Sequence, residues 1–444
     1  MSRRSCNGYS EPAAVVPEVP GAPRVVLGID FGTSNSAAAA VDASGQLRVM
    51  PLEADRAAMP TALFFCHETQ QTFYGSQAMQ AYLGGTEGRL MRAIKSLLGS
   101  ALMDEQTVVN GQAISFFDIV VLFFKALKAR SEAALGHEIT HATLGRPVHF
   151  VDDDTQRDAL AQATLGRAAQ AAGFAHIAFE LEPIAAAFDY EQRVRRETTA
   201  LVVDMGGGTS DFTVIRLGPQ RRQQADRRSD ILATTGVHLG GTDFDRLLNL
   251  DHVMPLLGYG HLGREGRAVP NSLFFELSTW HLIHHAYTRK SLNFARELWT
   301  SYTDLSLHAR LMEVLENRDG HRLLAAVEAA KIACSESQSS AAIDLHFLKA
   351  AQATDLPASN ITAAGMAATL GQALAQVVQC ARQCVQDAGL ATVDVVYLTG
   401  GSSALQPLKD AMQAAYPQAE LVHGDRFGGV AAGLAWAGFH AQQD

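Results

Sequence analysis

The chain has 444 residues, 47% of them hydrophobic, and its 46 acidic residues outnumber the 36 basic ones to give a formal net charge of −10. This apolar content can fill a buried core and excludes a disordered or fibrous chain, and the length predicts two or three domains or one two-lobed α/β body. The acidic balance argues against general binding to nucleic acid or to an anionic membrane, because both need a cationic surface.

Three further features of the composition bear on location. The strongest apolar segment, Ile119 to Phe124, ends at Lys125 and falls far short of the roughly 18 residues of a membrane span. Residues 1–23 are rich in proline and are expected to form a disordered tail. The cysteines are few and odd in number, which favours reduced thiols over a disulfide framework and indicates a cytoplasmic protein. They are Cys6, Cys66, Cys334, Cys380 and Cys384.

A strand–turn–strand unit occurs twice. The β-branched run Arg24–Asp30 leads into the turn Phe31–Asn35 and a second strand, Ser36–Val41, and the same pattern fills Ala200–Leu217 around the glycine turn Met205–Ser210. Two copies of one unit, about 170 residues apart, predict an internally duplicated, two-lobed fold. Neither copy leads into a helix, which excludes a Walker A loop and a Rossmann fingerprint.

Caps and apolar periodicity predict the remaining elements. Helices are expected over Phe116–Leu135, Asp152–Gly173, Ile184–Gln192, Ala325–Ser335, Met366–Leu390, Pro407–Ala415 and Phe427–Phe439, with a strand at Val393–Leu398. On the second of these helices, Leu160, Leu165, Ala168 and Ala172 are predicted to share one apolar side. The weakly patterned stretch Leu250–Leu323 predicts a helical insert. The expected domains are lobe I over 24–198, to which 424–444 return, and lobe II over 199–423.

The two glycine turns have the chemistry of a phosphate site. Asp30 stands at a strand end before a tight turn, where successive backbone N–H groups can bind phosphate oxygens. A carboxylate beside phosphates implies a cation, which we expect to be Mg²⁺ held through waters, although such a turn alone is also typical of a plain hairpin. The second turn repeats the carboxylate as Asp204 and adds three consecutive glycines, which cost strand stability and are expected where the backbone approaches a ligand. The two opposed turns could clamp a triphosphate.

Three other clusters are less specific. The turn Gly400–Ser402 is either a connection to the next helix or a close approach to a nucleoside. For His281, His284 and His285, a surface or half-buried helix face is favoured over a metal site. The arginines of a predicted hairpin tip are expected to be solvated, because the chain is acidic overall; they are Arg216, Arg221, Arg222, Arg227 and Arg228.

The chain resembles the ATPase domain of the DnaK-type, 70-kDa heat-shock family of the actin-like superfamily. The resemblance rests on six segments in order: GIDFGTSNS, EPIAAAFDY, VVDMGGGTSDF, HLGGTDFD, VEAAKIACSES and YLTGGSS. It extends from Val25 to the end, apart from the divergent Leu250–Leu323, and the GRPVHF segment is most similar to the YegD-like branch. It implies an α/β fold with two duplicated, ribonuclease-H-like lobes. It also implies binding of ATP or ADP with Mg²⁺ (and allows K⁺), slow hydrolysis, lobe closure that signals to a protein partner or client, and membership of a chaperone family.

The resemblance also assigns roles to individual residues. Asp30, Glu182 and Asp204 match the carboxylates around the Mg²⁺ waters, and Lys95 matches the lysine that contacts the γ-phosphate and the attacking water. Thr209 matches a γ-phosphate contact, Asp211 the carboxylate that positions water, and Pro147 with Glu182 a switch between nucleotide state and lobe closure. The remaining nucleotide contacts would be Gly32, Thr33, Ser34, Asn35, Gly206, Gly207, Gly208, Gly240, Gly241, Gly400, Gly401 and Ser402, with Glu328, Lys331 and Ser335 along the adenosine.

The chain departs from the family at two points. The arginines that flank adenine in the family fall at Ile332 and Ala404, which predicts adenine binding weaker by about 1 kcal/mol or more through lost cation–π contacts. No peptide-binding β-sandwich is expected after the ATPase domain, so the insert 250–323 is the predicted contact for a protein partner. Two alternatives stay open: a small-molecule kinase of the same superfamily, and a non-hydrolysing, nucleotide-gated scaffold or filament.

Overall fold

The computed structural model describes residues 25–442 except 43, 55, 152–153, 225–226, 264–265, 349–358 and 425–427. The expected tail over residues 1–23, with Cys6, lies outside the described residues. Among the described helices, none combines the length and the apolar character that a membrane crossing requires.

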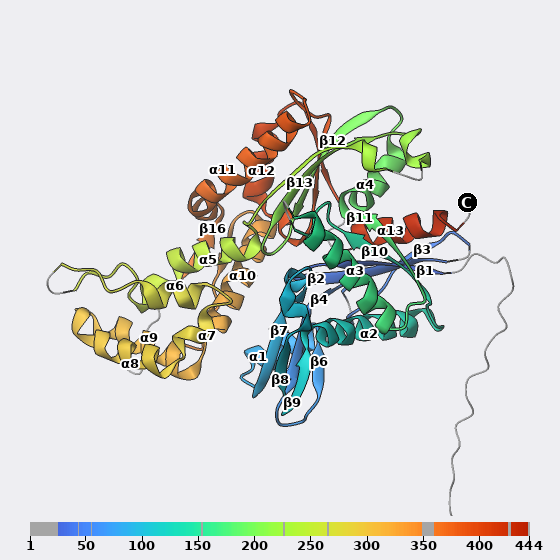
Figure 1. The fold of residues 1–444 in the computed structure, drawn as a ribbon. Helices are drawn as coiled ribbons and strands as arrows, with labels where there is room; N and C mark the ends of the chain where they lie inside the picture. The colour runs from blue at the N-terminus through green and yellow to red at the C-terminus, as the bar shows by residue number, and fades with distance from the viewer. Residues whose placement is uncertain are drawn as a thin grey trace, which may run out of the picture.

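Two sheets with the same strand order form the centre of the molecule (Figure 1). In the first sheet the order is β11-β10-β1-β2-β3, with β1, β10 and β11 parallel and β2 and β3 antiparallel, and β4 also pairs with β2. In the second the order is β14-β13-β12-β17-β18, which repeats the first order read from its other end, with β12, β17 and β18 parallel and β13 and β14 antiparallel. These strands are β1 (Val26–Phe31), β2 (Asn35–Val41), β3 (Leu47–Val49), β4 (Ala58–Pro60), β10 (His141–Arg146), β11 (His176–Leu181), β12 (Thr198–Met205), β13 (Ser210–Leu217), β14 (Ile231–Val237), β17 (Val395–Thr399) and β18 (Glu420–His423).

Helices α4 (Glu182–Arg193) and α13 (Gly429–His440) lie between the two sheets (Figure 1). One apolar cluster joins α4, β12, β17 and α13, so these elements share a core. The approach is close enough to require glycine: a Cβ on Gly28 of β1 would lie 2.2 Å from the Ala435 nitrogen, and one on Gly433 would lie 2.1 Å from the Ala185 oxygen. The end of the chain is thereby fixed against β1 and α4.

The outer faces of the sheets are covered by longer helices. On the first sheet these are α2 (Phe116–Leu135) and α3 (Thr155–Ala171), and on the second α5 (Gly241–His252), α11 (Ala363–Asp387) and α12 (Gln406–Ala415). The bounds predicted for α2 are confirmed. The predicted apolar side of α3 is wrong at Leu160, which is 49% exposed while Leu165 and Ala168 are fully buried, because the sheet covers only one narrow stripe of the helix.

A small β arm extends from the first sheet. It consists of the sheet β6-β5-β7, made of β5 (Ala62–Cys66), β6 (Thr72–Tyr74) and β7 (Gly88–Arg92), with α1 (Ser76–Leu83) and the hairpin of β8 (Gln106–Val109) and β9 (Gln112–Ser115). A short 3-10 helix, Ile94–Leu97, follows β7 and carries Lys95.

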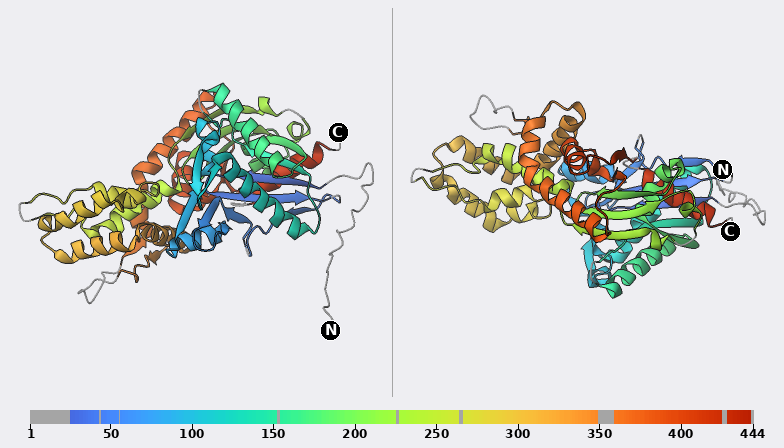
Figure 2. Two further views of the ribbon diagram at one scale, coloured as in Figure 1. Left: turned by 60° about the horizontal axis from the view of Figure 1, so that its bottom comes forward. Right: turned by 90° about the horizontal axis from the view of Figure 1, so that it is seen from above.

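Residues 254–317 form a helical arm that extends away from both sheets (Figures 1 and 2). It contains α6 (Ser272–Ser278), α7 (Ile283–Ala286), α8 (Arg289–Glu297) and α9 (Leu305–Asn317), with 3-10 turns at Met254–Leu257 and Leu298–Ser301. Its buried residues, among them Phe274 and Leu311, belong to the same apolar cluster as the second sheet. Helix α10 (Gly320–Ser337) returns from the arm to the strand pair β15 (Ser340–Ala342) and β16 (Asn360–Thr362).

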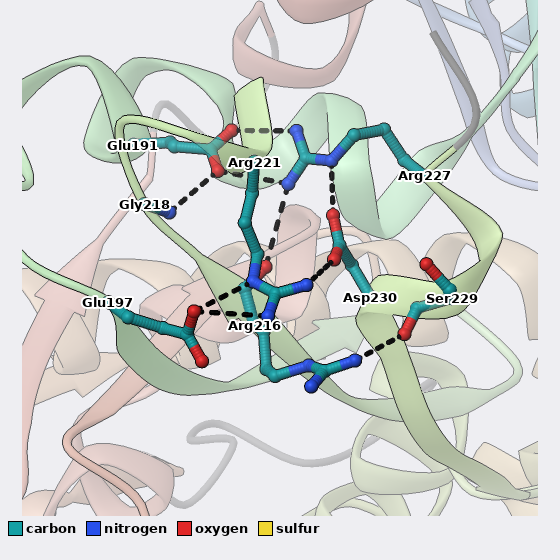
Figure 3. A network of polar contacts seen from close by, with 8 residues as sticks. All are labelled: Glu191, Glu197, Arg216, Gly218, Arg221, Arg227, Ser229 and Asp230. Carbon is teal, nitrogen blue, oxygen red and sulfur yellow. Dashed lines mark hydrogen bonds and ion pairs between the residues drawn. The ribbon is translucent and has the colours of Figure 1, made fainter. Parts of the chain in front are cut away.

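The arginine-rich hairpin between β13 and β14 differs from its prediction (Figure 3). Arg227 is buried, not solvated, and its guanidinium donates to both carboxylate oxygens of Glu191 on α4 at 2.9 Å and to Asp230, which is fully buried. Arg221 bridges Asp230 at 2.6 Å and Glu197 at 3.0 Å. The partner carboxylate of Arg227 comes from a helix 36 residues earlier, so local composition did not reveal it. We call Glu191, Arg227 and Asp230 the buried clamp.

Candidate functional site

The two predicted phosphate turns meet. A Cβ added to Gly207, between β12 and β13, would lie 2.1 Å from the Ser34 hydroxyl, between β1 and β2. The first turn is held from behind by Thr61, whose backbone N–H donates to the Ser34 carbonyl and whose hydroxyl donates to the Gly32 carbonyl, both at 2.8 Å. The structure therefore brings the two glycine turns into direct contact, as their opposed arrangement predicted.

The second turn is supported by two other glycine segments. The Gly241 amide donates to the Gly206 carbonyl at 3.1 Å, and the Ser402 hydroxyl donates to the same carbonyl at 2.9 Å. Gly400 has a φ of 83°, and a Cβ there would lie 2.4 Å from a carboxylate oxygen of Asp204. The turn at Gly400 thus connects β17 to a short helix, as one interpretation predicted, and packs closely against the Asp204 carboxylate. Its approach to a nucleoside stays a prediction.

Four ionisable side chains face one another beside these turns. The Lys95 ammonium lies 2.9 Å from Glu182 Oε1, joining the 3-10 helix after β7 to the first residue of α4. Burial raises the pKa of Asp30 to about 7, with repulsion from Glu182 as the second cause. Burial likewise raises the pKa of Asp204 to about 8, followed by repulsion from Glu182. Burial acts to lower the pKa of Lys95, but Glu182 and then Asp30 outweigh it and hold that pKa above its ordinary value.

A cavity of ≈70 Å³ lies next to this cluster. Its lining includes Glu182, Asp204 and Asp211 together with Pro147, so the predicted switch proline shares a cavity with three of the predicted carboxylates. The Thr209 hydroxyl donates to Asp211 at 3.1 Å. A larger groove of ≈500 Å³ runs between α3 and β11 and contains none of the predicted site residues.

The carboxylates do not form a direct metal cage. Within the described residues, no group of three or more His, Cys, Asp or Glu side chains is arranged to hold a metal ion. Mg²⁺ dehydrates reluctantly and is often held by one or two carboxylates with waters and substrate phosphates. Burial disfavours the charged forms of Asp30 and Asp204, and a nearby hydrated cation would stabilise those charged forms. The two carboxylates therefore fit a Mg²⁺ site in which waters lie between the ion and the protein.

On the predicted adenosine side, α10 presents residues of two kinds. Glu328 and Ile332 are exposed, Ile332 by 48%. Ser335 is buried, accepts a hydrogen bond from the Gln406 amide at 2.9 Å and donates to the Ala404 carbonyl at 3.3 Å, which joins α10 to the turn after β17. Lys331 is also buried, and its ammonium is paired with a carboxylate of α5.

That carboxylate, Asp245, was not predicted as a site residue. It lies 2.8 Å from the Lys331 ammonium. Burial raises the pKa of Asp245 to about 6, against the opposing attraction of Lys331. The signal was present in the sequence, since Asp245 is the last residue of the HLGGTDFD segment.

Four residues that the sequence did not single out join the β arm to the helical arm and to the start of α10. The Tyr82 hydroxyl on α1 lies 2.8 Å from His321 Nδ1, and the Arg92 guanidinium lies 4.3 Å from the centre of the Trp280 ring. Burial lowers the pKa of His321 to about 4, so the ring is neutral near pH 7. Its Nε2 lies 3.1 Å from the Trp280 carbonyl oxygen and donates to it, which leaves Nδ1 to accept from Tyr82. We call this contact the arm bridge.

Two comparisons with known proteins bear on the family of this chain. The family model described as Hsp70 protein matches residues 26–257, which include both glycine turns, Lys95 and the three carboxylates. The chaperone protein DnaK of Endomicrobium trichonymphae is 32% identical over 234 residues, and that of Thermotoga neapolitana is 31% identical over 225. These alignments cover 51% and 50% of this chain but only 34% and 35% of the relatives, so the chain spans about a third of the length of the curated proteins it matches.

Proposed function

The chain belongs to the Hsp70 family, and from this membership we propose that it binds Mg·ATP between two lobes and hydrolyses it slowly. The observation that carries the proposal is the joining of Lys95 to Glu182 at 2.9 Å beside the desolvated Asp30 and Asp204. These four side chains come from four separate segments of the chain. Three half-buried carboxylates beside one half-buried ammonium form a costly arrangement, which is typical of a functional site rather than of a stabilising core.

The turns would bind the phosphates. The close approach of Gly207 to Ser34 supports this role, because backbone N–H groups of two adjacent turns can donate to the oxygens of one phosphate chain. Bound Mg²⁺ would neutralise charge that develops on the transferred phosphoryl group. Asp30, Glu182 and Asp204 would hold its waters, and Lys95 would donate to the γ-phosphate.

Water activation would depend on Asp211 and Thr209. Asp211 lies at the start of β13, lines the cavity that Asp204 and Glu182 also line, and accepts a hydrogen bond from the Thr209 hydroxyl. That bond holds the carboxylate in one orientation, in which it can accept a proton from a water placed in line with the phosphate. Phosphoryl transfer needs positioning and charge stabilisation more than covalent help, so this small set of groups is sufficient.

Nucleotide state would be transmitted through α4. Its first residue, Glu182, contacts Lys95, and the helix lies in the core shared with β12, β17 and α13. The shared strand order of the two sheets supports the duplicated lobes predicted from the sequence. We take the helical arm, within the predicted insert 250–323, as a contact for a protein partner or client. We also place the protein in the cytoplasm, which suits the free thiols of Cys66, Cys334, Cys380 and Cys384.

The test is single-turnover hydrolysis of Mg·ATP by the full chain, with wild type beside Asp211→Asn. We expect phosphate release by the wild type and a loss of about 100-fold or more in the variant, which keeps the size of the side chain and removes the proton acceptor. The matched control is Asp104→Asn, because Asp104 is exposed and lies on a 3-10 helix outside the site. Equal release by wild type and Asp211→Asn would contradict the assigned role.

The non-hydrolysing scaffold is the second candidate. The observation that favours it is the exposed Ile332 at the place where the family has an adenine-flanking arginine. This candidate would be supported over the ATPase if the wild type and Asp211→Asn both bound nucleotide without releasing phosphate, and if the light scattering of the wild type depended on nucleotide. ADP production that depends on an added metabolite would instead indicate the small-molecule kinase.

A further inference from the structure

The end of α4 and the β13–β14 hairpin together form a basic surface on an acidic protein. Residues 191–230 contain eight arginines, whereas the whole chain carries a net charge of −10. Five of these arginines are exposed. We call them the arginine surface: Arg193, Arg195, Arg196, Arg222 and Arg228.

Hydrogen bonds hold the two segments of this surface side by side. The Arg222 guanidinium donates to the Gln192 side chain at 3.1 Å, and Arg221 donates to Glu197 at 3.0 Å. The Gly218 amide donates to Glu191 at 2.9 Å (Figure 3). Residues 192–197 and the hairpin therefore present one continuous surface.

The carboxylates of the buried clamp do not pair with the exposed Arg195, Arg196 and Arg222. Glu191 and Asp230 are buried, and they form their ion pairs with Arg227 and Arg221. The exposed carboxylates nearby are fewer: Glu197 pairs with Arg221, and Asp394 lies 3.7 Å from Arg196, whose side chain remains 81% exposed. Arg195 has no hydrogen-bond or ion-pair partner among the residues that the structure describes.

We propose that the arginine surface is a docking site for an acidic segment of a protein partner. Guanidinium groups bind carboxylates through paired, charge-assisted hydrogen bonds. The buried clamp joins the end of α4 to the hairpin and so fixes the backbone that carries these arginines. Such pre-organisation lowers the entropy cost of binding. The surface lies at the opposite end of α4 from Glu182, and it is separate from the helical arm considered above.

A nucleic acid fits this surface less well. Proteins that bind single strands interleave basic residues with aromatic side chains on which bases stack. The only aromatic residue from 191 to 230 is Phe212, and it is fully buried. The net charge of −10 would also repel a long polyanion, whereas a short acidic segment can contact the basic surface alone.

The experiment measures binding of a fluorescent twelve-residue, glutamate-rich peptide to the full chain by anisotropy. The test variant is Arg195→Glu/Arg196→Glu/Arg222→Glu. The control is Arg48→Glu/Lys125→Glu/Arg382→Glu, which reverses three exposed charges outside the arginine surface and the helical arm and changes the net charge by the same amount. We expect binding to weaken at least about tenfold in the test variant and less than about twofold in the control, because only the former turns local attraction into repulsion.

A milder variant protects the test against misfolding. The triple change to glutamine at positions 195, 196 and 222 should give an intermediate loss, with an unchanged melting temperature. The proposal is overturned if the wild type shows no saturable binding, or if test and control variants lose binding equally. It is also overturned if a twelve-nucleotide RNA binds the same three arginines more tightly than the peptide does. None of these readouts requires ATP hydrolysis, so failure here is distinct from failure of the proposed ATPase.

Discussion

Replacing Asp204 by asparagine should stabilise the nucleotide-free protein, and the gain should grow with pH. Burial raises the pKa of Asp204 to about 8, followed by repulsion from Glu182 and Asp211, whereas the ordinary value is 3.8. Between these two values the folded protein retains a proton that the unfolded chain has released. The contribution of Asp204 to the free energy of unfolding is therefore greatest below about pH 4 and is lost as the pH rises to about 8.

The size of the effect follows from the same two values. A pKa of about 8 against 3.8 corresponds to at most about 6 kcal/mol above pH 8, at about 1.4 kcal/mol per tenfold change in proton affinity. Water and cations that enter the cleft screen the carboxylate and reduce this cost. We expect Asp204→Asn to raise the free energy of unfolding by about 2–4 kcal/mol at pH 8.5 and by much less at pH 5. This corresponds to a melting temperature about 5 °C higher.

The assay is thermal unfolding from pH 5 to 8.5 with a chelator and without nucleotide. Asp104→Asn serves as the matched control, since that aspartate is exposed and its replacement should leave a difference independent of pH. A difference between Asp204→Asn and wild type that stays constant with pH would refute the reasoning. A loss of stability in the variant at pH 8.5 would do so as well, because it would mean that the carboxylate is stabilised in the folded protein.

Three further predictions concern the glycine turns, the buried clamp and the arm bridge. Gly207→Ala should weaken nucleotide binding about tenfold in calorimetry, because its Cβ would lie 2.1 Å from the Ser34 hydroxyl, whereas Gly371→Ala on α11 meets nothing within 4 Å and should bind normally. Arg227→Ala should lower the free energy of unfolding in denaturant by about 3–5 kcal/mol, since it leaves the buried Glu191 without an ion pair and Asp230 with Arg221 alone. Tyr82→Phe should speed release of a fluorescent nucleotide about two- to tenfold in stopped flow, because it removes the hydrogen bond of the arm bridge.

Each of these predictions has a result that contradicts it. For the glycine pair, normal binding by Gly207→Ala would show that the two turns have room to separate. Arg222→Ala is the control for the clamp, because Arg222 is exposed, and equal losses from both arginines would show that the buried pairs carry no special weight. For the arm bridge, an unchanged release rate in Tyr82→Phe would place the slow step of nucleotide exchange elsewhere.

Local patterns in the sequence were sufficient for those parts of the molecule whose structure depends on neighbouring residues. The two glycine turns lie between β1 and β2 and between β12 and β13, as predicted, because a glycine turn that directly follows a β-branched run is a strong local signal for the end of a strand. The bounds of α2 were also predictable, since Ser115 caps its first turn and Gly136 ends it with a φ of 80°.

The candidate site could be predicted in composition but not in contacts. The two glycine turns led to Asp30 and Asp204, and the resemblance to the family led to Lys95 and Glu182. That the Lys95 ammonium meets Glu182 depends on packing the 3-10 helix after β7 against the start of α4, which lie 87 residues apart in the chain. No local pattern encodes a distance across two sheets.

Tertiary structure alone decided which charged residues are buried. Arg227 and Arg228 are neighbours in an arginine-rich stretch, yet the first is held by Glu191 of α4 and the second is exposed. Lys331, on a helix with a regular pattern, is buried because Asp245 of α5 meets it. Burial of a charge is favourable only where a partner of opposite charge arrives from elsewhere in the fold, and the position of that partner is a property of the packed chain rather than of the sequence around the charge.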